Sequence, residues 1–373
     1  MRRLDHLDAL RAGAMLVVVL WHVTVFWPPV LPLSPSSLSV IQWPMALSRW
    51  SLPLFFLMAG FFGALLHARW GTARFARDRL VRIGVPLLVG LVTIVPVTWL
   101  LFNKSYSADS DIFREGPLHL WFLWYLLLFY ALVAALPHLP GVAWLRRRLV
   151  ALLGSALAVP VLAAFTTALL FAVGQLPPAP ALWLVPQPVM VVFYGSFFAI
   201  GALVHGSSSG MDLVGRRLGL NAALALASVV PTVLLSPGPI WVGLGTLAPS
   251  GRDYLRIAAI CLLAWSGTFA VCGLGRRWLA VERPALRYVA DSSYWIYLMH
   301  LPLALVLVVT PLGLPFPVAW LLVVTLLFSI LLGLYELVVR HSVVGRVLNG
   351  PRPPRGWGLR RRRRASVPEG ASG

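Results

Sequence analysis

The segment LDALRAGAMLVVVLWHVTVFW, residues 7–27, decides how the chain is organised. Residues 14–21 are all apolar, and as a helix rising ~1.5 Å per residue the segment is long enough to cross a hydrocarbon layer of ~30 Å. It nevertheless contains Arg11 and His22. Because an ionisable side chain at membrane depth is costly, each of these two residues is a candidate functional residue.

The composition indicates that the whole chain, and not only this segment, is suited to a membrane. Of 373 residues, 59% are hydrophobic and 12% are charged, and the mean hydropathy is +0.83. These values exclude a water-soluble enzyme and predict an all-α, polytopic protein of the cell membrane. We expect about ten transmembrane helices, at residues 9–28, 44–66, 83–102, 118–136, 149–174, 187–205, 218–236, 255–275, 291–311 and 317–339.

The positive charge follows the predicted topology. The formal net charge is +19, and the arginines fall in alternate loops, as they do when short cytoplasmic loops retain Lys and Arg during insertion. This pattern predicts that both termini are cytoplasmic, and it argues against nucleic acid as a partner. We expect a membrane domain over residues 1–345 and a basic, disordered cytoplasmic tail over 346–373, attracted to anionic lipids.

Arg11 and His22 are eleven residues apart, which is three helical turns plus about 20°. Both side chains should therefore project from one face of the helix, about 16 Å apart along its axis. An arginine can hold an anion without losing its charge, and a histidine can take up a proton near neutral pH. The alternative is a membrane anchor for Arg11, paired with Asp8, and a packing role for His22; spacing alone leaves both readings open.

Arg79 and Arg82 begin the third predicted helix, in RFARDRLVRIGVP. At i and i+3 they project along one side of a helix, where two guanidinium groups can hold a phosphate or pyrophosphate. The alternative is ordinary positive charge at the cytoplasmic side of the membrane. When this segment is considered by itself, that alternative is favoured.

Two further segments place histidines at membrane depth. PLHLWFLWYLLLFY, residues 117–130, contains His119 and Trp121, and SSYWIYLMH, residues 292–300, ends at His300. An interfacial aromatic belt explains Trp121 but not His119. His300 either faces His22 in a polar pocket or is satisfied by a neighbouring carbonyl.

Metal and disulfide chemistry are not indicated. No Cys/His zinc spacing occurs, so we expect no metal site. Cys261 and Cys272 lie in one apolar segment, about 16 Å apart on a helix, which is too far for a disulfide.

Five segments, taken in order, resemble the acyltransferase-3 superfamily of integral membrane acyltransferases, and within it the branch that contains glucan biosynthesis protein C. They are LDALRAGAMLVVVLWH with its Arg-x10-His spacing, LFFLMAGFF, RLVRIGVP with Arg-x2-Arg, HLWFLWYLLLFY and SYWIYLMH. Each segment alone is a weak signal, whereas five in order are specific. The resemblance runs from Leu7 to about Arg340.

The resemblance implies an O-acyltransferase that moves an acetyl or succinyl group from cytoplasmic acyl-CoA to a hydroxyl of a cell-surface or periplasmic carbohydrate or glycolipid. Acyl-CoA is the donor substrate, and no tightly bound cofactor is expected. The implied roles are catalysis by His22 with Arg11, donor binding by Arg79 and Arg82, and acceptor binding by His119, Trp121, Tyr294 and His300.

A multi-pass transporter or flippase of a glycolipid or small anionic solute is the alternative from another functional class. Ten helices with buried histidine and arginine, interrupted by prolines, are compatible with alternating access. Against this, the sequence contains no repeated halves.

Overall fold

The computed structural model describes residues 5–27, 35–105, 116–135, 140–173, 184–205, 210–236, 251–279, 283–310 and 312–350. All regular structure in these ranges is helical, which confirms the predicted fold class. The helices are α1 (Asp5–Val25), α2 (Pro35–Leu47), η1 (Ser48–Trp50), α3 (Ser51–Trp70), α4 (Thr72–Arg79), η2 (Leu80–Gly84), α5 (Val85–Val92), α6 (Ile94–Ser105), η4 (Leu118–Leu120), α7 (Trp121–Ala135), α8 (Val142–Gly154), α9 (Ala158–Val173), α10 (Pro188–Val204), α11 (Gly210–Val214), α12 (Leu218–Leu234), α13 (Gly251–Trp278), α14 (Pro284–Val308), α15 (Phe316–Leu334), η6 (Tyr335–Val339) and α16 (Val343–Asn349).

The apolar helices make the chain a multi-pass membrane protein. Among the described residues, six helices are long and apolar enough to span a bilayer, and a seventh span results if the pair 72–92 and 94–103, bent by 40°, is counted as one. Shorter apolar helices cover 158–172, 188–204 and 218–234. Each predicted span overlaps one of these helices, while the count of ten crossings and the location of the termini stay predictions. The tail beyond residue 350 lies outside the described residues.

The predicted span 149–174 is wrong as a single helix, and the predicted span 83–102 is bent by 40° between α5 and α6. The chain from 149 to 174 divides between α8 and α9, because Ser155 adopts an extended conformation. The Ser155 hydroxyl donates to the carbonyl oxygen of Leu152 at 2.8 Å and accepts from the backbone N–H of Leu157 at 3.2 Å. The Leu152 carbonyl oxygen also accepts from the backbone N–H of Ser155 at 2.8 Å. The bond from Leu157 gives one backbone N–H of the break a partner.

Helices α1 and α14 pack in parallel against each other, and two side-chain contacts mark their register. Near the start of α1, the Arg11 guanidinium donates through Nη2 to the carbonyl oxygen of Ala290, at 2.8 Å. Near its end, His22 Nδ1 lies 3.3 Å from His300 Nε2. Eleven residues separate the contacts on α1 and ten on α14, about 15–16 Å in each helix. The two helices thus hold a common register over three turns.

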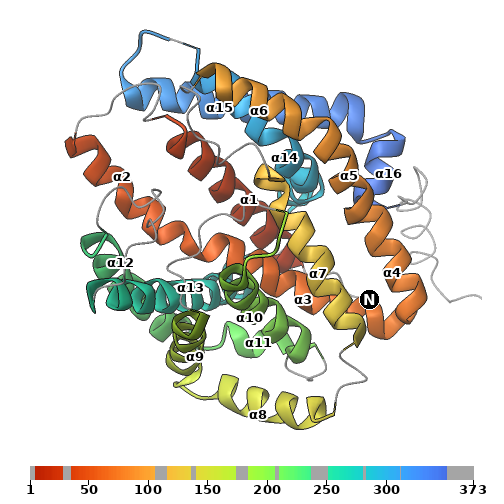
Figure 1. Cartoon of the computed structure of the whole chain (residues 1–373), viewed down its shortest axis with the longest axis vertical. Coiled ribbons are helices and arrows are strands. Elements are labelled where there is room, and N and C mark those ends of the chain that lie inside the picture. Colours follow the sequence, from red (N-terminus) through yellow and green to blue (C-terminus); the bar gives the residue numbers. More distant parts are fainter. Residues whose placement is uncertain are drawn as a thin grey trace, which may run out of the picture.

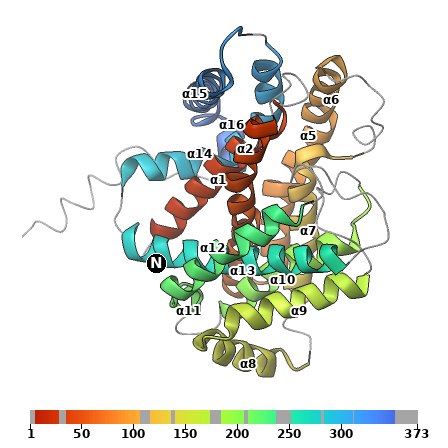
Figure 2. The ribbon, with the colours of Figure 1, turned by 90° about the vertical axis from the view of Figure 1, so that its left-hand side faces the viewer.

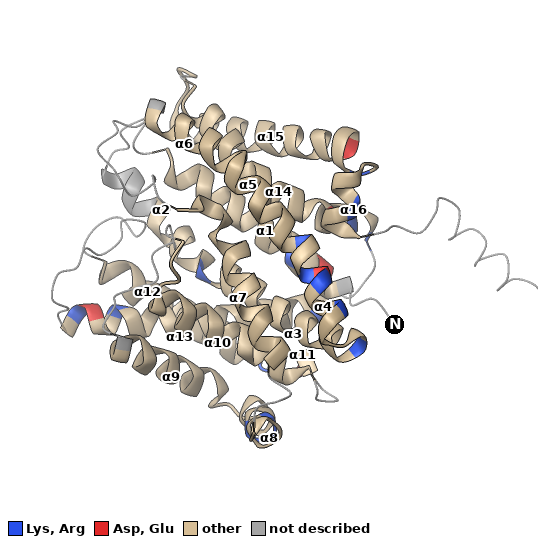
Figure 3. Cartoon of the chain, turned by 45° about the vertical axis from the view of Figure 1, so that its right-hand side comes forward, with Lys and Arg blue, Asp and Glu red and all other residues tan. Residues whose placement is uncertain are grey.

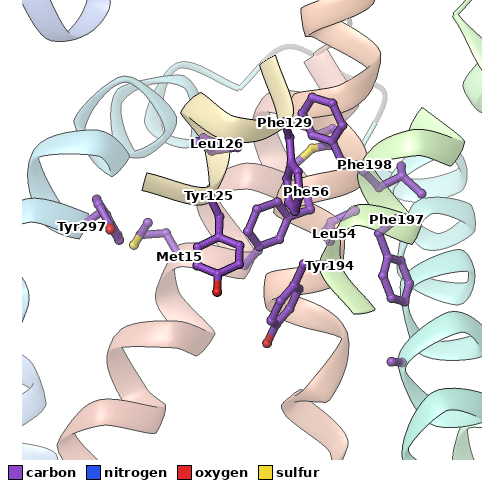
Figure 4. Packing of buried hydrophobic residues seen from close by; sticks show 14 of the residues in the cluster. Met15, Leu54, Phe56, Tyr125, Leu126, Phe129, Tyr194, Phe197, Phe198 and Tyr297 are labelled. Carbon is purple, nitrogen blue, oxygen red and sulfur yellow. The ribbon is translucent and has the colours of Figure 1, made fainter. Parts of the chain in front are cut away.

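The packing of α3 against α10 depends on two glycines. A Cβ atom at Gly60 would overlap the carbonyl oxygen of Phe198, and one at Gly201 would overlap that of Leu57. Small residues at such crossings allow membrane helices to approach closely. The close approach brings together the aromatic side chains of α3, α7 and α10, among them Phe56, which lies between Tyr194 and Phe129 (Figure 4).

Figures 1 and 2 place α6 and α15 at one end of the molecule and α8 at the opposite end, with α1, α3 and α7 between them. Lys and Arg gather on α4 and α8 (Figure 3). We call the end of α1 and α14 that carries Arg11 and Ala290, beside the arginines of α4 and η2, the arginine-rich end.

Candidate functional site

A cavity of about 130 Å³ brings three histidines together. Its walls include His22 from α1, His119 from η4 and His300 from α14, with Trp121 at the start of α7. These residues lie up to 278 positions apart in the sequence. Four of the predicted site residues therefore share one cavity.

The hydrogen bonds of His22 and His300 determine which nitrogens carry protons. His22 Nδ1 lies 2.8 Å from the carbonyl oxygen of Val18, and His300 Nδ1 lies 2.7 Å from that of Tyr297. A carbonyl oxygen only accepts, so each Nδ1 is the donor. In the neutral rings both Nε2 atoms then carry lone pairs: that of His300 faces the Nδ1–H of His22 at 3.3 Å, and that of His22 is left to act as a base.

His119 contributes a further acceptor. Its Nε2 donates to the carbonyl oxygen of Leu298 at 3.0 Å, so Nδ1 has the lone pair. Nδ1 is buried and has no hydrogen-bond partner in the part of the chain that the structure describes. Leu118, immediately before it, has φ 46°, a left-handed conformation that is costly for a branched residue and typical of functional sites.

Aromatic and hydroxyl groups complete the cavity. Trp121 is 6% exposed, and its ring lies 5.3 Å from that of Tyr194 between centroids. Tyr297 donates from its hydroxyl to the carbonyl oxygen of His119 at 2.6 Å, which ties α14 to η4. Aromatic faces beside hydrogen-bonding groups suit a ligand with both apolar and polar surfaces.

Arg49 in η1 also lines the cavity, and sequence reasoning missed it. The signal was present, because an arginine between apolar helices at membrane depth is a functional hypothesis like Arg11. Arg49 therefore places a guanidinium group at the wall of the histidine cavity.

Arg79 and Arg82 lie in a separate cluster at the arginine-rich end. Both form ion pairs with Asp78: Arg79 through Nε and Nη2, and Arg82 through Nε at 2.9 Å. Arg79 also lies over the ring of Tyr130, 5.2 Å from its centroid. A π-helical turn begins between the two arginines, at Leu80. One carboxylate thus holds two guanidinium groups together and leaves the cluster one net positive charge.

Tyr294 belongs to this cluster. Its hydroxyl donates to the carbonyl oxygen of Arg82 at 2.7 Å, and it does not line the histidine cavity, where the sequence had predicted it. Six residues separate Tyr294 from His300 on α14, about 9 Å along the axis. The tyrosine therefore links the arginine cluster to the helix that leads to the cavity.

Arg11 combines both readings of the sequence. It pairs with Asp8 at 3.5 Å, as the anchor alternative expected, and it donates to Ala290 on α14.

No group of three or more His, Cys, Asp or Glu in the described residues has a metal-binding arrangement. Cys261 and Cys272 are both free and buried.

Comparison with known proteins identifies the family of this chain. The family model of the acyltransferase-3 acyltransferase domain matches residues 4–335. Similar curated proteins include glucans biosynthesis protein C of Salmonella heidelberg, 22% identical over 334 residues, and that of Salmonella paratyphi B, 23% identical over 343 residues. Each alignment covers 80% of this chain and 82% of the relative. No solved structure matches. Since the family model covers most of the chain, the protein belongs to the acyltransferase-3 family of membrane acyltransferases.

Proposed function

We propose that this acyltransferase moves an acetyl or succinyl group from acyl-CoA to a hydroxyl of a carbohydrate or glycolipid. The acyltransferase domain supports the reaction class. The carbohydrate acceptor is suggested by relatives whose name refers to glucans. Acyl-CoA is proposed as donor because the arginine cluster suits the phosphates of such a molecule.

One observation carries the proposal: His22 lines a cavity with Nδ1 bound to a backbone carbonyl, which leaves Nε2 as a base. In direct transfer, Nε2 of His22 takes the proton of the acceptor hydroxyl while the oxygen of that hydroxyl attacks the carbonyl carbon of the thioester. The carbon–sulfur bond then breaks, and the leaving sulfur takes the proton from His22. Such general-base catalysis is typically worth about 10²- to 10⁴-fold.

Donor and acceptor would reach this histidine from opposite ends. Arg79 and Arg82, with help from Arg11, would hold the phosphates of acyl-CoA at the arginine-rich end, leaving the thioester arm to extend toward His22. His119 and Trp121 would contact the acceptor. The parallel contact of α1 with α14 supports this arrangement, because both helices lead from the arginine-rich end to the cavity.

The test uses the full chain purified in detergent, with acetyl- or succinyl-CoA and a glucan acceptor. We expect thioester consumption that depends on acceptor, and a loss of at least about 10²-fold in His22→Ala. His67→Ala, a histidine of α3 bonded to Thr72, should retain full activity. A His22→Ala protein that is folded and fully active would refute the proposed role of His22.

Two further outcomes separate mechanisms. A transporter or flippase would not consume acyl-CoA without a sealed vesicle. Rapid quenching with labelled donor distinguishes direct transfer from an acyl-histidine intermediate, because direct transfer gives no protein-bound label before acceptor is added.

A further inference from the structure

His300 packs against His22 and has no contact with solvent. Its side chain is 0% exposed. Its Nδ1 is held by the carbonyl oxygens of Tyr297 at 2.7 Å and Ile296 at 3.2 Å. Two carbonyl acceptors fix the proton on Nδ1, so Nε2 can only accept a hydrogen bond while the ring is neutral. The atom opposite this lone pair is Nδ1 of His22, at 3.3 Å.

The His22 proton therefore lies between two acceptors. The Nδ1–H of His22 is near the carbonyl oxygen of Val18 at 2.8 Å and Nε2 of His300 at 3.3 Å. Val18 belongs to the same helix, so its bond orients the ring only within α1, whereas His300 relates the ring to α14. The rings of His22 and His300 meet edge to face, with centroids 4.8 Å apart.

When His22 accepts a proton during catalysis, its ring becomes positively charged inside the membrane domain. A charge in such surroundings is costly unless acceptors face it. Among the described residues lining the cavity no carboxylate is present, so the lone pair of His300 takes the place that a carboxylate occupies behind the catalytic histidine of other enzymes.

We propose that His300 is a positioning residue that acts through His22: it fixes the orientation and Nδ1 proton of His22 and stabilises the charged ring in the transition state. This inference rests on the proposed role of His22 as the base. It assigns to His300 a function other than the contact with acceptor that the family resemblance implied.

The first test compares two replacements of His300. Leucine removes the acceptor atom, whereas glutamine places an amide oxygen near the position of Nε2. We expect His300→Leu to lower kcat by about 10²-fold with both KM values within about twofold, since the lost interaction exists mainly in the transition state. His300→Gln should recover most of this loss. The matched control is His205→Leu, a histidine at the end of α10 whose ring contacts Phe61; it should keep the parent kcat.

The second test is a double-mutant cycle. If His300 acts through His22, His300→Leu should have no further effect in a His22→Ala protein. A rise in acceptor KM at unchanged kcat would show that His300 binds the acceptor and would overturn the proposal. Equal losses in the leucine and glutamine variants, additive with His22→Ala, would show a structural role and also overturn it. Full activity of His22→Ala would refute the role of His22 as the base. This result differs from each of the outcomes that overturn only the role of His300.

Discussion

His119 differs from the other two histidines of the cavity in its hydrogen bonding. Its Nε2 is committed to Leu298, while its buried Nδ1 has no partner among the described residues. A buried acceptor without a partner costs about 1–3 kcal/mol, which a bound donor would recover. A second hydroxyl of a carbohydrate acceptor, other than the one that reacts, is such a donor.

We therefore predict that His119→Phe raises the KM for the acceptor about tenfold, equivalent to about 1.4 kcal/mol, with the donor KM unchanged. His119→Asn, which places an amide oxygen near the former Nδ1, should bind acceptor nearly as well as the parent. Initial rates at varied acceptor concentration measure this. A change confined to the donor KM would contradict the assignment.

At the level of single residues, sequence identified the histidines because each is an expensive residue in an apolar segment. The resemblance grouped Tyr294 with His300, whereas the two residues, six positions apart on one helix, meet different neighbouring elements, which spacing alone did not show. Sequence reasoning missed Arg49 because no spacing to another ionisable residue drew attention to it. The position of Tyr294 depends on a contact between distant segments, its bond to Arg82.

The π-helical turn η2 sets the position of Arg82 among the helices at the arginine-rich end. Arg79 is 14% exposed and packs over Tyr130, whereas Arg82 is 28% exposed and contacts Asp78 through Nε at 2.9 Å. Replacing Arg79 would disturb packing as well as charge. Arg82 is therefore the cleaner test of donor binding.

We predict that Arg82→Gln raises the KM for acyl-CoA about tenfold, or about 1.4 kcal/mol, and changes kcat by less than about twofold, because the phosphates are remote from the reacting carbonyl. Arg77→Gln, an exposed arginine on the preceding helix α4, is the matched control and should leave KM unchanged. Equal effects of both variants would indicate diffuse electrostatic attraction in place of a specific site.

Among the helices, sequence predicted the long uniform ones best. The α13 helix, Gly251–Trp278, contains the predicted 255–275, and α15 with η6 covers the predicted 317–339. The break at Ser155 was not predicted, because apolar residues continue on both sides and only the local bonds of the serine end α8. The short helix α16, Val343–Asn349, was also missed, although Ser342 caps it by accepting from Gly345.

For the whole molecule, the distribution of arginines predicts which end faces the cytoplasm. Arg147 is exposed on α8, and Leu314 is 41% exposed in the connection between α14 and α15. The native cysteines are buried, so they give little background in labelling experiments.

We predict that a membrane-impermeant maleimide added to intact cells labels Leu314→Cys, while Arg147→Cys reacts only after the membrane is opened. Retained acyltransferase activity is the control for correct insertion of each variant. The reverse pattern would invert the topology, and with it the side from which acyl-CoA must arrive.

The two contacts between α1 and α14 limit how the lengths of these helices can change. One residue inserted between Arg11 and His22 would turn the imidazole by about 100° and shift it by ~1.5 Å, so that either the bond to Ala290 or the approach to His300 would be lost. A compensating insertion between Ala290 and His300 would have to accompany it. Insertions and deletions within 11–22 or 290–300 should therefore be tolerated only as matched pairs.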